Sequence, residues 1–468
     1  MTRTAEKDEG ETTSDMALDR ESLKILARSL EKLDAGFVEL PDFAPNYSGS
    51  ERIEEVLLTL AEKLRDNYPY FHPMYAGQML KPPHPVARLA YSLAMYINPN
   101  NHALDGGRAT SALEQEAVAE IAAMFGWKEF LGHLCGGGTM ANLEALWVAG
   151  QLRSGKTILA SEQAHYTHSR VSRVLQLPFE KVDCNRSGRM DADALAKRVE
   201  RGDVGTVVVT MGTTATGSVD PLPEILELQK KFGFRVHADA AYGGYFALAS
   251  NLGENAARSF ARIGEADSIV IDPHKHGLQP YGCGCVLFRD PGVGQLYKHD
   301  SPYTYFSSAE LHLGEISLEC SRPGAAAAAL WATQKLLPLI HEGEFARGLE
   351  RGREAALRFF RRLESGGKFI PAFEPELDIL VFVPKGDSPE EISAKSRRTF
   401  AATARAGLHL ALAELPARFW RTKCRVASDE RRESPAETVT CLRSVLMKPQ
   451  HLDWAKQIVE TLESCSVE

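Results

Sequence analysis

Gly205-Thr-Val-Val-Val-Thr210 is the stretch that decides the fold, together with two shorter apolar runs that follow it, Arg235-Val-His-Ala238 and Ser268-Ile-Val-Ile271. A fourth run of the same kind, Thr157-Ile-Leu-Ala160, precedes them. Nearly continuous apolar runs are typical of strands that are buried on both faces of a parallel sheet. Stretches with helical periodicity separate these runs, at 139–150, 191–201 and 222–232. The alternation predicts an α/β domain with a doubly wound, mainly parallel sheet.

Different patterns flank this domain on both sides. Before it, leucine and isoleucine residues recur at helical spacing on either side of the polar stretch 41–50, which predicts two amphipathic helices. After it, a charged helix, short apolar runs and a closing helix predict a small α+β domain. We therefore expect a disordered tail over 1–20, a helical segment over 21–75, a large domain over 76–343 and a small C-terminal domain over 344–468.

The composition restricts the class of protein. Of the 468 residues, 44% are apolar and 25% are charged, which excludes disordered and fibrous classes. The net charge of −8 offers no basic surface for nucleic acid, so we expect small molecules or a second copy of the chain as partners. The eight cysteines have no regular spacing, and neither a secretory leader nor a membrane-spanning stretch is evident. We therefore expect a cytoplasmic protein.

A run of three glycines, Gly136-Gly-Gly138, precedes Thr139 at the start of a predicted helix. Glycines let the backbone approach a ligand closely, and free N–H groups at a helix N-terminus bind phosphate well. No lysine follows the glycines, so the run is not a P-loop. By itself the run equally fits a tight turn packed against the sheet.

Asp239 follows directly on the apolar run 235–238. A carboxylate at the end of a buried strand needs a partner, and Ala241 two positions later leaves a flat space beside it. An acid beside a flat space suits an aromatic heterocycle whose ring nitrogen must stay protonated. The alternative is an aspartate that caps the next turn.

Lys275 follows the strand at 268–271, in the segment Asp272-Pro-His274-Lys275-His276. A lysine at a strand end can form a Schiff base, although a lysine in a loop is usually just solvated. We do not predict a metal site at the two histidines, nor at the pair Cys283-Gly-Cys285, which lacks a second pair of ligands.

A phosphate-binding turn, an acidic strand end and a strand-end lysine, in this order, are what pyridoxal phosphate requires from a protein. On these segments the chain resembles the pyridoxal-phosphate-dependent amino acid decarboxylases of the aromatic amino acid, tyrosine and glutamate decarboxylase family, from about Glu51 to Pro449. The resemblance implies a large domain like that of aspartate aminotransferase (fold type I) and pyridoxal 5'-phosphate as cofactor. It also implies a homodimer with the active site at the interface, in which 21–75 is the dimerisation segment and 76–343 binds the cofactor.

The resemblance also assigns roles to single residues. Lys275 matches the lysine that holds the cofactor as a Schiff base, and Asp239 matches the carboxylate that faces the pyridine nitrogen. His165 resembles the histidine that stacks on the ring and positions the carboxylate that is lost. Further positions match the phosphate contacts, the small residue under the ring and neighbours of the cofactor: Gly138, Thr139, Ala241, Thr214 and His274.

Tyr303 resembles the loop tyrosine that protonates the α-carbon after carbon dioxide leaves, although Tyr305 is close enough to compete for this role. A tyrosine here argues against the related aldehyde synthases, which carry phenylalanine. Gln78 and Arg443 resemble substrate contacts of glutamate decarboxylases.

The resemblance predicts that the protein decarboxylates an L-amino acid. Aromatic residues near the presumed pocket favour an aromatic substrate, namely Tyr70, Phe71 and Tyr75. Gln78 and Arg443 favour aspartate or glutamate instead. An aminotransferase or a lyase on the same fold is a further alternative, whereas a non-catalytic relative is expected to have lost Lys275.

Overall fold

The computed structural model describes residues 20–41, 49–298, 313–420 and 438–466. Contacts divide the chain into two compact units, Met1–Phe71 and His72–Glu468. In the first unit, α1 (Arg20–Asp34) and α2 (Ser50–Leu64) are the two helices that the leucine and isoleucine spacing predicts. No residue of either helix is buried. None of the helices in the described ranges is long and apolar enough to cross a membrane.

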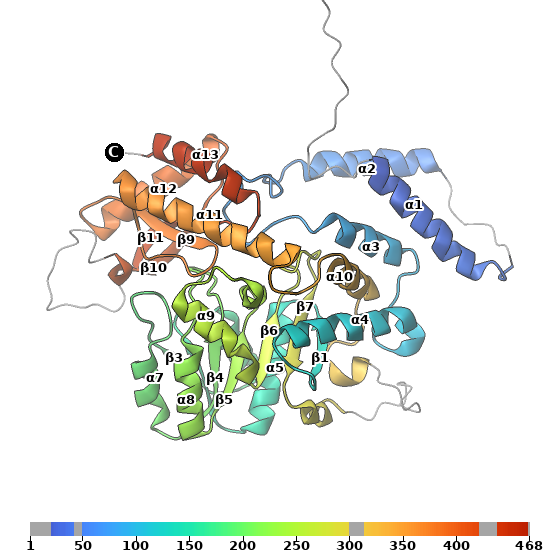
Figure 1. The fold of residues 1–468 in the computed structure, drawn as a ribbon, viewed down its shortest axis with the longest axis horizontal. Helices are drawn as coiled ribbons and strands as arrows, with labels where there is room; N and C mark the ends of the chain where they lie inside the picture. Colours follow the sequence, from blue (N-terminus) through green and yellow to red (C-terminus); the bar gives the residue numbers. More distant parts are fainter. Residues whose placement is uncertain (1–19, 42–48, 299–312, 421–437, 467–468) are drawn as a thin grey trace, which may run out of the picture. The chain divides into compact units, whose positions relative to one another are not determined.

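A seven-stranded sheet forms the centre of the second unit (Figure 1). Five neighbouring strands run parallel, and β7 is antiparallel to both of its neighbours. The four predicted strands are all in the parallel part. In spatial order the strands are β1 (Leu131–Cys135), β7 (Gly284–Phe288), β6 (Ser268–Ile271), β5 (Arg235–Asp239), β4 (Val204–Thr210), β2 (Thr157–Ser161) and β3 (Phe179–Val182).

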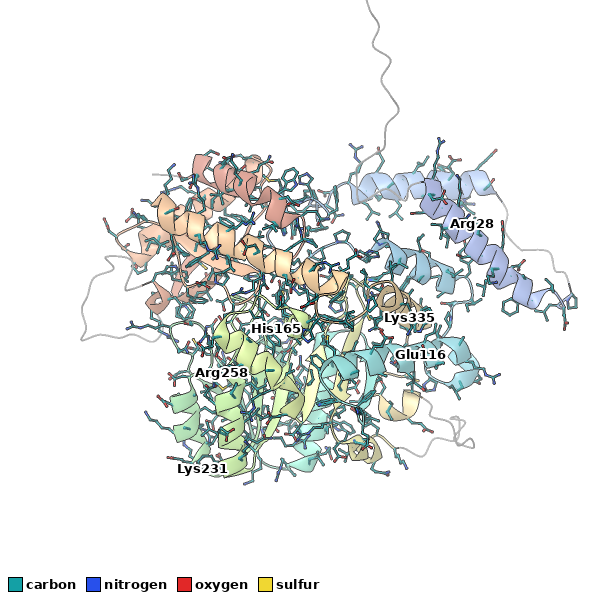
Figure 2. The ribbon with its side chains drawn as sticks, viewed as in Figure 1. Arg28, Glu116, His165, Lys231, Arg258 and Lys335 are labelled. Carbon is teal, nitrogen blue, oxygen red and sulfur yellow. The ribbon has the colours of Figure 1, made fainter. Side chains whose placement is uncertain are left out.

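Both faces of this sheet are covered, as the apolar runs predict. In β4, Val208 packs with residues of α5 (Gly138–Leu152) and α6 (Thr167–Val174). Its neighbours Val207 and Val209 belong to the other face, which is covered by α4 (Leu104–Met124), α8 (Leu222–Phe232), α9 (Glu254–Ala261) and α10 (Gly324–Leu336). Two of these helices are joined by an ion pair, in which Lys335 Nζ of α10 lies 3.9 Å from Glu116 Oε2 of α4 (Figure 2). The predicted doubly wound α/β fold is thereby confirmed.

The remaining elements include a four-stranded antiparallel sheet near the C-terminus. Its order is β10 (Ala411–Pro416), β11 (Thr438–Val445), β9 (Ile379–Pro384) and β8 (Phe369–Pro371). Three helices accompany it, α11 (Glu344–Gly366), α12 (Pro389–Arg405) and α13 (His451–Ser464), and elsewhere lie α3 (Pro85–Met95) and α7 (Ala192–Val199). The small α+β part at the C-terminus is as predicted, while the domain boundaries at 75 and 343 stay predictions.

The topology brings the predicted chemistry to one edge of the central sheet. Thr210 of β4 is level with Asp239 of β5, and Asp239 is level with Val270 of β6. β1 is antiparallel to β7, so it runs in the same direction as β6 and ends at the same edge. Loops that follow the carboxyl ends of such strands are where α/β proteins bind their ligands.

Candidate active site

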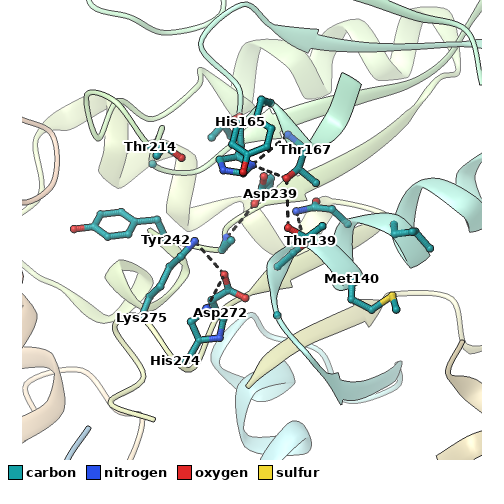
Figure 3. A pocket seen from close by; sticks show the side chains of 18 of the residues that line it. Thr139, Met140, His165, Thr167, Thr214, Asp239, Tyr242, Asp272, His274 and Lys275 are labelled. Atoms are coloured by element: carbon teal, nitrogen blue, oxygen red, sulfur yellow. Dashed lines mark hydrogen bonds and ion pairs between the residues drawn. The ribbon is translucent and has the colours of Figure 1, made fainter. Parts of the chain in front are cut away.

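A cavity of about 600 Å³ lies at this edge (Figure 3). Its walls come from the loops after β1, β2, β4, β5 and β6 and from the first turns of α5 and α6. The cavity brings together all eight residues that the sequence predicts around the cofactor, although they span 138 positions of the chain: Gly138, Thr139, His165, Thr214, Asp239, Ala241, His274 and Lys275.

The glycine run forms one end of the cavity. Gly137 has a φ of +147°, which side chains rarely allow, and no side chain caps the helix α5 that follows. A Cβ atom on Gly138 would lie 2.7 Å from Asp272 Oδ2. A Cβ atom on Gly284 of β7 would lie 2.5 Å from Gly137 Cα, so the strand and the glycine run are in backbone contact. The uncapped N–H groups at this end fit a phosphate.

Asp239 forms another wall of the cavity and is 5% exposed. His168 Nε2 lies 2.7 Å from its Oδ2, and the backbone N–H of Ala241 donates to its Oδ1 at 3.2 Å. Burial by itself would raise the pKa of Asp239. The hydrogen bond from His168 and the charges of His168, His237 and Lys275 outweigh burial and hold this pKa well below its usual value. Asp239 is therefore an anion, as a protonated ring nitrogen requires.

Lys275 reaches the cavity from the loop after β6. Its Nζ lies 3.0 Å from Asp272 Oδ2 (Figure 3). The other oxygen of Asp272 is buried and has no hydrogen-bond partner among the described residues. The neighbouring ring of His274 stacks against Tyr281 at 4.9 Å between ring centroids. The sequence alone assigns no role to Asp272, although its position directly after a buried strand resembles that of Asp239.

His165 follows β2 and is held by Thr167, as Figure 3 shows. The backbone N–H of Thr167 donates to His165 Nδ1 at 3.3 Å, and the Thr167 hydroxyl lies 2.7 Å from the same nitrogen. Burial lowers the pKa of His165; among the neighbouring charges, that of Asp239 raises it and that of Lys275 lowers it further. A neutral ring whose Nδ1 accepts a hydrogen bond carries its proton on Nε2. His165 can therefore donate from Nε2.

The predicted substrate residues lie outside this cavity. Arg443 Nη1 is 3.3 Å from Gln78 Oε1, so these two residues contact each other, but neither lines the cavity. Tyr303 and Tyr305 fall in 299–312, outside the described residues. Within the described parts of the chain, no group of three or more potential metal ligands is found.

The cavity fits pyridoxal phosphate. Uncapped backbone N–H groups lie at one end, an anionic carboxylate lies in the wall, and a lysine reaches in from a third loop. Ala241, which is 9% exposed, leaves space beside Asp239. Sequence reasoning missed three residues that organise this arrangement, namely Asp272, Thr167 and His168. The spacing of His165 and His168 was the available signal, since both could point toward one site from a turn of helix.

Comparison with known proteins agrees with this chemistry. Residues 147–385 match the family model described as the pyridoxal-dependent decarboxylase conserved domain, and the chain belongs to this family. The L-tyrosine decarboxylase of Enterococcus faecium is 27% identical in an alignment that covers 75% of each chain. The L-aspartate decarboxylase of Thermococcus kodakarensis is 29% identical over 296 residues, covering 63% of this chain and 75% of that protein.

Solved structures show the same fold. Apo mouse CSAD superposes with a TM-score of 0.75 at 18% identity, over 96% of this chain and all of that one. Oryza sativa TDC, solved with PLP and tryptamine, gives a TM-score of 0.75 at 15% identity over 96% of this chain and 99% of that one. The protein is therefore a pyridoxal-phosphate-dependent amino acid decarboxylase, while the roles of its single residues stay predictions.

Proposed function

We propose that the protein converts an aromatic L-amino acid to its amine and carbon dioxide. The observation that carries this proposal is the lining of the cavity, which contains Tyr166 and Tyr242 and, among the described lining residues, no lysine or arginine except Lys275. A carboxylate on the substrate side chain would find no free cation there to compensate for its removal from water. An uncharged aromatic ring needs no such partner. The tyrosine decarboxylase among the relatives supports the same choice.

In the reaction we assign to the site, the bond between the α-carbon and the carboxylate breaks, and a proton takes the place of carbon dioxide. Lys275 would hold pyridoxal phosphate as a Schiff base until the substrate amine takes its place, and the cofactor would then supply a ring that accepts the electrons released by this bond. Asp239 keeps a positive charge on the ring nitrogen, where negative charge builds up from the reacting carbon. The N–H groups at the start of α5 hold the phosphate, with Thr139 beside them.

His165 has a separate task in this proposal. Its Nε2–H would donate to the substrate carboxylate and so orient the bond that breaks. The proton that reaches the α-carbon comes from Tyr303 or His165. Thr214, Ala241 and His274 line the cavity and would define the space around the ring.

A substrate panel tests the proposed specificity. We expect carbon dioxide from L-tyrosine, L-tryptophan or L-phenylalanine, with kcat/KM at least about a hundredfold above that for L-aspartate or L-glutamate. The reverse order would exclude an aromatic substrate and leave the decarboxylase assignment intact. Borohydride reduction of the loaded protein tests the site itself, since the cofactor should become fixed to Lys275 and should not be fixed in Lys275→Ala.

An acidic substrate is the second candidate, because a cluster of cations lies behind Tyr242. The Tyr242 hydroxyl donates to Asp378 at 2.6 Å, and the nearby Arg443 has two buried nitrogens without a hydrogen-bond partner among the described residues. Lys448 is also buried, and burial followed by the charge of Lys81 lowers its pKa to about 7. If L-aspartate or L-glutamate is the better substrate, Arg443→Met should raise KM with little change in kcat.

We also propose that two copies of the chain associate, and that the protein is cytoplasmic. One side of α2 carries apolar side chains at spacings of three and four residues, and each is at least 46% exposed: Ile53, Val56, Leu57 and Leu60. We infer that a second copy of the chain covers this stripe.

A further inference from the structure

His168 lies beneath the proposed cofactor site and has no role in the reaction described above. It belongs to the first turn of α6 and is fully buried, although it is an ionisable residue. Its Nε2 is 2.7 Å from Asp239 Oδ2, across 71 positions of the chain. A buried histidine at this distance from a carboxylate forms a charge-assisted hydrogen bond.

The contacts of this pair define its hydrogen-bond pattern. An ionised carboxylate only accepts hydrogen bonds, so His168 Nε2 carries the proton and donates it. The other oxygen of Asp239 accepts from the backbone N–H of Ala241 at 3.2 Å. Each oxygen therefore has one donor from the protein, and Asp239 still lines the cavity. His168 Nδ1 has no hydrogen-bond partner among the described residues.

We propose that His168 is a positioning residue that keeps Asp239 ionised and directed at the ring nitrogen of bound pyridoxal phosphate. This inference rests on the proposed role of Asp239. His168 does not touch the cofactor itself, and it acts through the carboxylate. It thereby influences how strongly the bound cofactor can withdraw electrons.

The other charged or ionisable groups near Asp239 have partners of their own. The two ring nitrogens of His237 in β5 are each 2.8 Å from a partner, Ser268 Oγ and Asn142 Oδ1. His165 is held by Thr167, and Lys275 is paired with Asp272. If His168 is removed, Oδ2 therefore loses its donor in a buried position. A buried carboxylate that loses one of its two donors takes up a proton more readily, and a neutral acid holds a pyridinium poorly.

Cofactor binding by the apoprotein is the first test. His168→Phe fills the space without a donor, and titration with pyridoxal phosphate should show about tenfold to a hundredfold weaker binding. His168→Gln supplies an amide N–H and should recover most of the loss. Ser172→Ala is the matched control, because Ser172 is buried one turn further along α6 and its hydroxyl has no hydrogen-bond partner among the described residues. This control should bind as the wild type does.

A double-mutant cycle with Asp239→Asn is the second test. If His168 acts through Asp239, His168→Phe should change cofactor affinity by less than about threefold once Asp239 is asparagine. An equal loss in both backgrounds would overturn the inference and leave the proposed function standing. Unchanged binding and absorbance in Asp239→Asn itself would overturn the role of Asp239 and the inference with it. Wild-type binding by His168→Phe would overturn the inference alone.

Discussion

Thr167 shows how one residue can set the chemistry of another. Its backbone N–H donates a hydrogen bond to Nδ1 of His165, and its hydroxyl lies within hydrogen-bond distance of the same nitrogen. The proton of the neutral ring is therefore on Nε2. The hydroxyl also lies 3.4 Å from the hydroxyl of Thr139 at the start of α5. Thr167 therefore links the histidine to the proposed phosphate end of the cavity.

We predict that Thr167→Val lowers kcat about threefold to tenfold, because one neutral hydrogen bond to the histidine is lost while the backbone donor stays. KM should change little, since the proposed binding groups are untouched. Thr167→Ser keeps the hydroxyl and should behave as the wild type. Steady-state kinetics on the preferred substrate measure this, and a fully active valine variant would show that the hydroxyl has no part in catalysis.

A second prediction at the residue scale concerns how the stability of the fold depends on pH through His451. This histidine is the first residue of α13 and fully buried, and its Nδ1 accepts a hydrogen bond from the backbone N–H of Lys448. Burial, and then the charge of Lys448, lower its pKa to about 3. Because the unfolded chain takes up this proton near pH 6.5, acidification from pH 6.5 toward 3 favours unfolding.

The comparison with His451→Gln isolates this effect, since glutamine retains an acceptor and does not titrate. The difference in free energy of unfolding, wild type minus variant, should fall by about 2 kcal/mol between pH 7.5 and pH 5. Urea unfolding of both proteins at the two pH values measures it. A difference that does not change with pH would mean that His451 is not held neutral.

At the scale of elements, the contact of β7 with the glycine run is sensitive to substitution. Gly284→Ala would place a methyl group 2.5 Å from Gly137 Cα, so backbone must move. We predict destabilisation of about 1–3 kcal/mol together with weaker binding of pyridoxal phosphate. Gly348→Ala in helix α11 is the control, because a Cβ atom at this position would lie 3.5 Å from Pro449 Cγ, which is an ordinary van der Waals contact. Thermal unfolding and cofactor titration of both variants check the prediction, which requires the two effects to occur together.

Elements were predictable where burial leaves a pattern in the sequence. The parallel strands are buried on both faces and read as apolar runs, and α8 begins and ends as predicted. By contrast α10 is rich in alanine and is buried on several sides, while the buried face of α4 includes polar residues such as Thr110 and Glu114, so no apolar periodicity distinguishes these helices. Asp239 and Lys275 were predicted because each lies at the end of an apolar run, whereas the roles of His165 and Thr214 came only from the resemblance to the family. The contact of His168 with Asp239 was not predicted, because it joins two elements whose neighbourhood only the folded chain defines.

At the scale of the whole molecule, the apolar stripe of α2 predicts the oligomeric state. Light scattering should give twice the mass of one chain. Val56→Glu combined with Leu60→Glu should give single chains, because charged residues cannot be buried in an apolar contact. Glu55→Gln combined with Glu62→Gln, on the opposite side of the helix, should leave the mass unchanged. A wild-type protein with the mass of one chain would contradict the proposed association.

The backbone contact between Gly284 and Gly137 also has a consequence for the protein when pyridoxal phosphate is not bound. The backbone of the glycine run is in contact with the backbone of β7. We therefore expect the run to keep its shape when no phosphate is bound. Loss of pyridoxal phosphate should then leave a receptive protein rather than a collapsed one. A cell that runs short of the cofactor would keep a reserve of enzyme that regains activity on resupply, without new synthesis.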